Sequence, residues 1–269
     1  MGAEPATASR PVALVTGASS GIGLELARLC AKGGHDLVLT SRNEGKLQEL
    51  AKYLGGMYRA RVEVVPADLA VPTAPAAIMA RIIQLGLGVD VLINNAGFGH
   101  WGLFGRADSQ RVLDMLQVNV VALTHLTRLA LPRMVTQHRG RILNVASTAA
   151  FAPGPLMAEY YATKAFVLSF SQAIGNELRG TGVTVTALCP GPTRTGFAAQ
   201  AGLTGANAFA LPNVMAVEPV AEAGYRGMMR GKSVVVPGGM NKLLVASRRV
   251  VPPWLTLAIT RKFQERRGR

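Results

Sequence analysis

The sequence predicts an α/β fold in which one doubly wound domain carries a parallel sheet of about seven strands, followed by a C-terminal helical extension. Short apolar runs rich in β-branched residues alternate with amphipathic segments from residue 12 onward, which is the pattern of successive strand–helix units. The runs are apolar throughout, as expected for strands covered on both faces of a sheet. Hydrophobic residues make up 49% of the chain, and 30 glycines suit the many tight turns of this class.

The predicted elements follow one another without a linker, repeat or low-complexity tract, so we expect a single domain over 11–238. The apolar runs that predict strands are PVALVT at 11–16, LVLT at 37–40, VEVVP at 62–66, VDVLIN at 89–94, GRILNVA at 140–146, VTVTALC at 183–189 and SVVV at 233–236. The amphipathic segments between them predict helices at 21–32, 44–54, 74–85, 109–137, 157–179 and 217–229. A glycine pair ends the first helix, and 194–214, rich in Gly and Ala without periodicity, is predicted to be a mobile loop.

The net charge of +14 is concentrated at the C-terminus. Residues 226–269 contain eleven Lys or Arg and one acid, a balance of +10, whereas residues 1–225 contain eighteen basic and fourteen acidic residues, a balance of +4. This distribution argues against a general nucleic-acid surface and for a local role of the tail. We therefore expect no nucleic-acid partner.

The cysteines and the apolar runs narrow the class further. Cys30 and Cys189 are far apart in apolar contexts and form no Cys-x-x-Cys pattern, so we expect two core residues and no metal site. Residues 1–11 do not resemble a signal peptide, and the chain has no uninterrupted apolar run of about 18 residues. The expectation is a cytoplasmic protein.

Tyr160 and Lys164, with Ser147 thirteen residues upstream of the tyrosine, predict a reversible acid/base. Residues four apart share one face of a helix, so the ammonium can lie beside a cofactor that also faces the phenol. A free tyrosine has a pKa near ~10, and a neighbouring cation lowers that pKa because it favours the phenolate. The residue four after Tyr161 is Ala165, so Tyr161 is interpreted as a packing residue.

A glycine-rich loop at 16–23 joins the first strand to the first helix with the spacing Gly-x-x-x-Gly-x-Gly. In this context glycines let the backbone approach the phosphates of a dinucleotide, and the helix N-terminus supplies unpaired N–H groups. The second strand ends in Thr40, Ser41 and Arg42, where an NAD-specific protein places an acid on the ribose hydroxyl. Arg42 can pair with a 2′-phosphate instead, so we expect NADP(H) in preference to NAD(H).

Together these motifs resemble those of the short-chain dehydrogenase/reductase family. The matching features, in order, are the loop at 16–23, the run Asn94-Asn95-Ala96-Gly97, Asn119, Ser147, the pair Tyr160 and Lys164, and Pro190-Gly191. The resemblance covers 11–238 and is nearest to bacterial reductases of uncertain substrate. It implies a Rossmann-type domain, hydride transfer between a nicotinamide cofactor and a CH-OH or C=O group, and a homodimer or homotetramer.

The resemblance also assigns cofactor-binding residues. It implies that the pyrophosphate is held by Gly17, Ser19, Ser20, Gly21, Ile22 and Gly23. It implies that Arg42 faces the adenosine phosphate, and that the remaining contacts to adenosine and ribose come from Asp68, Leu69, Asn95, Ala96 and Gly97. The nicotinamide is implied to lie against Pro190, Gly191 and Thr193. Some NADP-preferring relatives place a basic residue where this chain has Ser20, so the NADP preference depends on Arg42 and the missing acid.

The catalytic residues that the resemblance implies are Asn119, Ser147, Tyr160 and Lys164. Ser147 is expected to donate a hydrogen bond to a carbonyl oxygen, and Tyr160 to protonate that oxygen. Lys164 is expected to bind the nicotinamide ribose and to lower the pKa of Tyr160. Asn119 is expected to hold a water that links Lys164 to solvent.

The segments expected to roof the site, 151–157 and 197–214, are apolar. No charged residue occurs from 195 to 217, which favours an apolar, lipid-like carbonyl compound or alcohol over a charged sugar or keto acid. A loop that packs shut would have the same composition, so the substrate class stays open. His100 and Trp101 could reach the substrate or be structural residues.

Beyond residue 238 the chain departs from the family pattern with a basic amphipathic extension at 239–269. Two helices are predicted at 241–251 and 253–267, divided by a pair of prolines. One apolar stripe of the second helix comprises Leu255, Ala258, Ile259 and Phe263, extended by Trp254. Such an extension could make a peripheral membrane contact through 241–269, cover the substrate cleft or pack on a partner subunit.

Three functions are consistent with these patterns. The leading one is an NADPH-dependent oxidoreductase that reduces an apolar ketone or aldehyde. The second is a nucleotide-binding regulatory or scaffold protein of the same fold without turnover, and the third is a membrane-recruited lipid reductase. Non-catalytic relatives usually lose the tyrosine or the lysine, so the presence of both Tyr160 and Lys164 favours an enzyme.

Overall fold

The computed structural model describes residues 10–202, 214–247 and 251–267. Its parallel strands form one sheet in the order β3-β2-β1-β4-β5-β6-β7. They are β1 (Val12–Thr16), β2 (Asp36–Thr40), β3 (Val62–Val64), β4 (Val89–Asn94), β5 (Gly140–Val145), β6 (Val183–Leu188) and β7 (Val234–Val235). The strand order reverses between β1 and β4, and doubly wound sheets bind ligands at the carboxyl ends of such a pair. The predicted fold class is confirmed.

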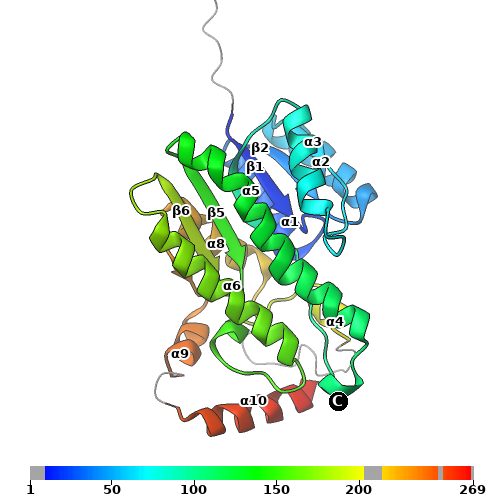
Figure 1. Cartoon of the computed structure of the whole chain (residues 1–269), viewed down its shortest axis with the longest axis vertical. Coiled ribbons are helices and arrows are strands. Elements are labelled where there is room, and N and C mark those ends of the chain that lie inside the picture. Colours follow the sequence, from blue (N-terminus) through cyan, green and yellow to red (C-terminus); the bar gives the residue numbers. More distant parts are fainter. Residues whose placement is uncertain (1–9, 203–213, 248–250, 268–269) are drawn as a thin grey trace, which may run out of the picture.

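Helices cover both faces of the sheet (Figure 1). One layer contains α1 (Gly21–Lys32), α2 (Glu44–Tyr58) and α8 (Val217–Met229), and the other contains α3 (Ala74–Gln84), α5 (Leu123–Thr136) and α6 (Ala158–Glu177). Along β1, Ala13 and Val15 pack into the first layer, and Val12 and Leu14 into the second. All four are buried, which explains the unbroken apolar run of this central strand.

The two edge strands are shorter than the sequence predicts. The strand predicted at 62–66 ends at Val64, and the one predicted at 233–236 comprises Val234 and Val235. Each has a single neighbouring strand, and its side chains are only partly buried. Apolar composition alone does not determine where such a strand stops pairing.

The helix predicted at 109–137 contains a π-helical segment. α4 (Ser109–Leu116) continues into η2 (Gln117–Ala122), and α5 begins at Leu123. π-helical turns are rare and occur frequently at functional sites. Here the segment contains Asn119, which is buried.

The C-terminal extension forms α9 (Gly239–Ser247) and α10 (Pro253–Arg267), which lie together at one end of the molecule (Figure 1). The predicted loop at 194–214 contains a short helix, α7 (Phe197–Gln200), and its residues 203–213 lie outside the described ranges. Within those ranges, no helix combines the length and the apolarity that a membrane span needs. Cys30 and Cys189 are buried and unpaired as predicted, and burial raises the pKa of each thiol to about 12.

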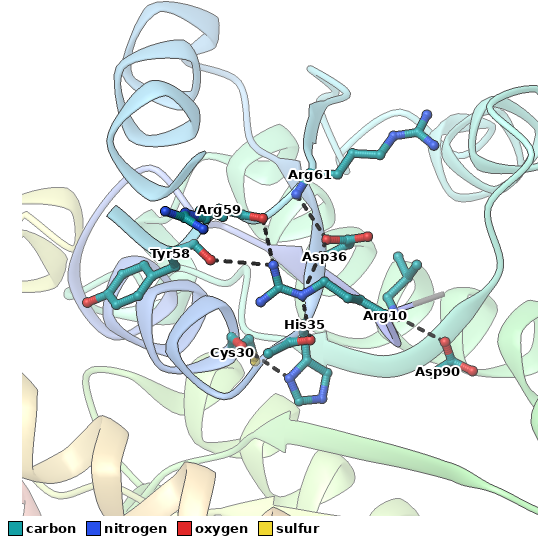
Figure 2. A network of polar contacts seen from close by, with 10 residues as sticks. Arg10, Cys30, His35, Asp36, Tyr58, Arg59, Arg61 and Asp90 are labelled. Atoms are coloured by element: carbon teal, nitrogen blue, oxygen red, sulfur yellow. Dashed lines mark hydrogen bonds and ion pairs between the residues drawn. The ribbon is translucent and has the colours of Figure 1, made fainter. Parts of the chain in front are cut away.

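Polar contacts anchor the amino end of β1 (Figure 2). Val12 N donates to Asp90 Oδ2 at 2.9 Å. The Arg10 guanidinium donates to Arg59 O at 2.6 Å and lies 3.9 Å from Asp36 Oδ1. These contacts join β1 to β4, to β2 and to the end of α2, at the edge of the sheet opposite the carboxyl ends of the strands.

Candidate active site

The carboxyl ends of the strands open into one cleft of about 940 Å³. Its wall is formed by the segments that follow β1 to β6, and residues of α9 and α10 complete the lining. Every site residue predicted from the sequence lines this cleft except Gly23 and Asn119. This position matches the ligand site of doubly wound α/β proteins.

The glycine loop after β1 forms a cradle for an anion. Gly17 and Gly21 adopt positive φ angles of 64° and 56°, which favour glycine. Ser20 is the N-cap residue of α1, yet its side chain makes no capping hydrogen bond, and the first turn of α1 has no acid. The first N–H groups of α1 therefore remain available to an anionic group, which the helix dipole also favours. The loop fits the pyrophosphate of a dinucleotide.

Asn95 holds this loop in place through hydrogen bonds to its backbone. Its Nδ2 donates to the carbonyl oxygens of Thr16 and Gly17 at 3.0 and 3.2 Å. Thr16 Oγ1 in turn accepts from the backbone N–H groups of Asn95 and Ala96. A Cβ on Gly23 would lie 2.3 Å from Asn95 Nδ2, so Gly23 permits close packing of α1 on the β4 loop. The structure places Gly23 behind the cradle rather than in its wall.

The wall after β2 carries one charged side chain, Arg42. It lines the cleft together with Thr40, Ser41 and Asn43, and its side chain is exposed. Asn43 caps α2 by accepting a hydrogen bond from Lys46 N at 3.0 Å. Asp68 and Leu69, after β3, line the same end of the cleft.

Ser147 follows β5 and caps the 3₁₀ helix η3 (Thr148–Phe151). Its Oγ accepts from Ala149 N at 3.1 Å and donates to Pro190 O at 3.4 Å. Thr148 N donates to the same carbonyl oxygen at 2.8 Å. These bonds tie the segment after β5 to the segment after β6 and hold the Ser147 hydroxyl on the cleft wall.

Tyr160 and Lys164 extend from α6 to the same part of the cleft. Lys164 Nζ lies 5.8 Å from the centroid of the Tyr160 ring and donates to Val145 O at 2.8 Å. Burial lowers the pKa of Lys164 to about 8, against a smaller opposing effect of Cys189. The structure thus brings a buried amine and a phenol together in the cleft that Ser147 also lines.

Asn119 lies behind this group in η2. Its Nδ2 donates to Phe98 O at 2.9 Å and to Thr163 Oγ1 at 3.1 Å, and its Oδ1 accepts from Phe98 N at 3.1 Å. Both amide protons are used, whereas an amide oxygen can accept a second hydrogen bond. A Cβ on Gly97 would lie 2.9 Å from Asn119 Oδ1 and 3.4 Å from Lys164 Nζ, so both atoms flank Gly97. These contacts position the β4 loop, and the water-holding role of Asn119 stays a prediction.

Aromatic and apolar side chains roof the cleft beyond Tyr160. Phe197 packs on Tyr160 with ring centroids 5.1 Å apart, in a cluster that includes Met157, Trp101 and Tyr161. Three other residues of the predicted roof lie outside the described ranges: Leu203, Phe209 and Leu211.

Helix α10 lies across this roof, so the C-terminal extension covers the cleft. Gln264 Nε2 donates to Tyr161 Oη at 2.7 Å, and Trp101 Nε1 donates to Gln264 O at 3.1 Å. Ile259 and Phe263 of the same helix line the cleft. The structure thus places α10 over the cleft, and contact with a membrane or a partner subunit stays a prediction. Trp101 and Tyr161 are structural contacts of α10.

Two residues at the site carry no motif that sequence analysis could have used. Asn241 of α9 is buried, and a Cβ on Gly191 would lie 2.4 Å from its Oδ1, so α9 packs on the segment after β6. Arg111 lines the cleft with its guanidinium 5.5 Å from the centroid of the Phe98 ring. For Asn241, the only signal in the sequence was a single asparagine in an otherwise largely apolar predicted helix.

Comparison with known protein families shows which family this chain belongs to. A profile described as short chain dehydrogenase matches residues 11–204. This chain belongs to the short chain dehydrogenase family. It is therefore an oxidoreductase, as the resemblance implied. The fold of this family binds a nicotinamide cofactor, and its members act on small molecules.

Two similar proteins are named for the reduction of ketoacyl compounds. The chain is 38% identical over 198 residues to a candidate ketoacyl reductase of the granaticin polyketide synthase from Streptomyces violaceoruber, across 73% of this chain and 72% of that protein. It is 37% identical over 177 residues to a very-long-chain 3-oxoacyl-CoA reductase of Phaeosphaeria nodorum, across 64% of this chain. The match spans only 52% of the second protein.

Solved structures of family members superimpose closely. A short-chain dehydrogenase from Sphingobium yanoikuyae in complex with NADPH has a TM-score of 0.80 and 37% identity, over 89% of this chain and 94% of that one. A bulky-bulky ketone specific alcohol dehydrogenase from Comamonas testosteroni has a TM-score of 0.76 and 33% identity, over 89% and 92%. A relative from Burkholderia phymatum in complex with NAD has a TM-score of 0.79 and 26% identity, over 90% and 93%.

Proposed function

We propose that this chain is an NADPH-dependent reductase that converts the ketone of an apolar, acyl-chain-like substrate into an alcohol. One observation carries the proposal: the anion cradle, the group Ser147, Tyr160 and Lys164, and the apolar roof all line a single cleft. The names of the ketoacyl and 3-oxoacyl reductases and of the ketone-specific dehydrogenase support the same chemistry.

In this proposal the residues of the chain bind and protonate the carbonyl oxygen. Ser147 Oγ, whose bond to Pro190 O is long at 3.4 Å, turns to donate to the substrate oxygen. Tyr160 transfers its phenolic proton to that oxygen, and the ammonium of Lys164 stabilises the resulting phenolate. The nicotinamide, when bound, supplies the hydride that reduces the carbon. Asn119 keeps the β4 loop and α6 in position through its bonds to Phe98 and Thr163.

The roof supports an apolar substrate. Met157, Phe197 and Phe263 line this part of the cleft, and its other described lining residues, from α7, α9 and α10, carry no charge. Burying one methylene contributes about 0.8 kcal/mol, close to a fourfold change in affinity. Such a roof favours a longer acyl chain and disfavours a charged sugar.

Arg42 supports NADPH as the cofactor. Solved relatives include complexes with NADPH and with NAD, so family membership alone leaves both possible. Among the described residues of the wall after β2, Arg42 is the one charge, and a guanidinium binds a phosphate with geometry that a ribose hydroxyl does not need.

The test uses two adjacent tyrosines as a matched pair. With NADPH and a panel of 3-oxoacyl thioesters and bulky ketones, we expect Tyr160→Phe to lower kcat by roughly 100-fold or more, the usual contribution of a general acid. Tyr161→Phe, which loses the bond to Gln264, should keep most of the turnover on small ketones. NADPH binding, followed by fluorescence, should survive both changes. Nucleotide binding without turnover of any panel member would instead favour the regulatory or scaffold alternative.

A further inference from the structure

Helix α10 buries polar side chains and leaves large apolar side chains exposed. Its buried side chains include Thr256, Thr260 and Gln264, four residues apart in sequence. The large apolar side chains that it leaves exposed are Trp254, Leu257 and Ile259, which are 68%, 40% and 55% exposed. A helix that only covered a cleft would bury its large apolar side chains. Covering the cleft therefore does not explain why these three side chains are exposed.

Helix α9 also leaves apolar side chains exposed. Its exposed apolar residues are Met240, Leu243 and Leu244, and both helices lie at the same end of the molecule (Figure 1). Exposed cations lie among the apolar side chains: Lys242 on α9 and Arg261, Lys262 and Arg266 on α10. Glu265 is the one acid in these two helices. We call these exposed apolar and basic residues the α9–α10 face.

We propose that the α9–α10 face docks on an anionic lipid bilayer. Tryptophan and aliphatic side chains favour the interface between headgroups and acyl chains, while lysine and arginine attract anionic headgroups. Both kinds of side chain are present on this face and exposed.

A second copy of the chain fits this face less well. A twofold contact places the same surface of two subunits together, so it would bring two sets of exposed cations, at 261, 262 and 266, into one interface. A nucleic acid would satisfy the cations but would leave a large apolar area without a partner. An anionic bilayer satisfies both components.

The same face borders the cleft. Leu244 and Ile259 line the cleft and are also 50% and 55% exposed, so they lie at its mouth. If the proposed reduction of an apolar ketone holds, a docked protein could take such a substrate from the lipid without exposing its chain to water. This consequence rests on the proposed function, whereas the docking does not.

The first test is co-sedimentation of the full chain with vesicles of phosphatidylcholine, with and without phosphatidylglycerol. We expect binding to the anionic vesicles at low salt and weaker binding at high salt. Lys262→Glu/Arg266→Glu should lower the partition coefficient by at least about 25-fold, since each cation near such a surface contributes roughly fivefold. The matched control, Lys46→Glu/Lys52→Glu, makes the same charge change on exposed positions of α2 and should bind nearly as wild type.

Fluorescence of Trp254 gives a second readout. Its emission should shift to shorter wavelength and be quenched by spin-labelled lipid, and Trp254→Phe should remove most of this change because Trp101 is held inside by Gln264. Failure to bind anionic vesicles, or an equal loss in both double variants, would overturn the proposal. A change of oligomeric state in Lys262→Glu/Arg266→Glu would assign the face to a second copy instead. Thermal unfolding of each variant, independent of turnover, confirms that it is folded.

Discussion

Lys164 has a charge that burial makes costly. The side chain is 5% exposed, and burial lowers its pKa from 10.5 to about 8. Below that lower value both the folded and the unfolded chain hold the proton, and the folded state bears the desolvation cost. Between about 8 and 10.5 the folded state releases the proton while the unfolded chain keeps it. The free energy of unfolding therefore rises with pH across this window.

We expect Lys164→Met to remove this pH dependence. Relative to the variant, the wild-type free energy of unfolding should rise by on the order of 3 kcal/mol across the window, since one pKa unit corresponds to about 1.4 kcal/mol. Urea denaturation of both proteins without cofactor, at several pH values, measures the difference. Parallel pH curves would show that Lys164 is not the responsible group. Wild-type turnover should fall as the pH passes about 8, because the neutral amine no longer stabilises the Tyr160 phenolate.

Arg42 is predicted to set the cofactor preference. A hydrogen bond between charged groups contributes about 1.5 to 3 kcal/mol, so Arg42→Ala should raise the KM for NADPH by roughly 10-fold to 100-fold. The KM for NADH should change little, because NADH has no phosphate at that position. Lys46→Ala, which removes a nearby exposed cation outside the cleft, is the control. The ratio of kcat/KM for the two cofactors is the measurement, and an unchanged ratio in Arg42→Ala would refute the assignment.

For single residues, the spacing within a motif predicted the site better than the composition of the chain did. The four-residue spacing separated Tyr160 from Tyr161, and the structure places the first beside Lys164 and the second under α10. Gly23 belongs to the same loop motif yet lies behind the cradle, where a Cβ would lie 2.3 Å from both Asn95 Nδ2 and the carbonyl oxygen of Gly17. A motif shows which residues occur together but not which of them face the ligand.

At the scale of helices and strands, the periodicity of apolar residues predicted which elements exist and in what order. It did not predict where a helix is interrupted. The apolar pattern of 109–137 continues through η2, and nothing in it signals a π-helical turn. The hydrogen bonds of Asn119 in this turn reach Phe98 and Thr163, on two other elements. Contacts of this kind arise from the assembled fold, so one segment of sequence does not contain them.

For helix α10, the sequence predicted the bounds but not the orientation. Its bounds, Pro253–Arg267, agree with the prediction, because a proline pair marks its start. Its orientation does not follow from its apolar stripe, since Gln264 binds Trp101 and Tyr161, more than a hundred residues earlier. Amphipathicity identified two faces but not which of them the protein covers.

At the scale of the whole molecule, a second set of exposed apolar side chains lies on α4, η2 and α6. α6 packs against α4 and η2, and the exposed apolar residues of these elements are Leu113, Leu116, Val121 and Phe166. Phe166 also stacks on Phe170 with ring centroids 5.6 Å apart. We call this surface the α4–α6 face.

We expect the α4–α6 face to be buried in a homodimer or homotetramer. Val121→Arg/Phe166→Glu should dissociate the assembly, because desolvating two buried charged side chains costs more than their mutual attraction returns. Light scattering after gel filtration measures the mass, and Tyr53→Arg/Met57→Glu, on exposed apolar positions of α2, is the control. An unchanged mass would place the interface elsewhere.

The two exposed surfaces lead to a joint expectation. α6 crosses the front of the molecule, whereas α10 lies across its lower end (Figure 1). An oligomer held through the α4–α6 face would carry several α9–α10 faces, and linked sites bind a surface more tightly than single ones. Val121→Arg/Phe166→Glu should therefore also weaken binding to anionic vesicles, although it alters no residue of the α9–α10 face. Full vesicle binding by a confirmed monomer would show that docking does not depend on assembly.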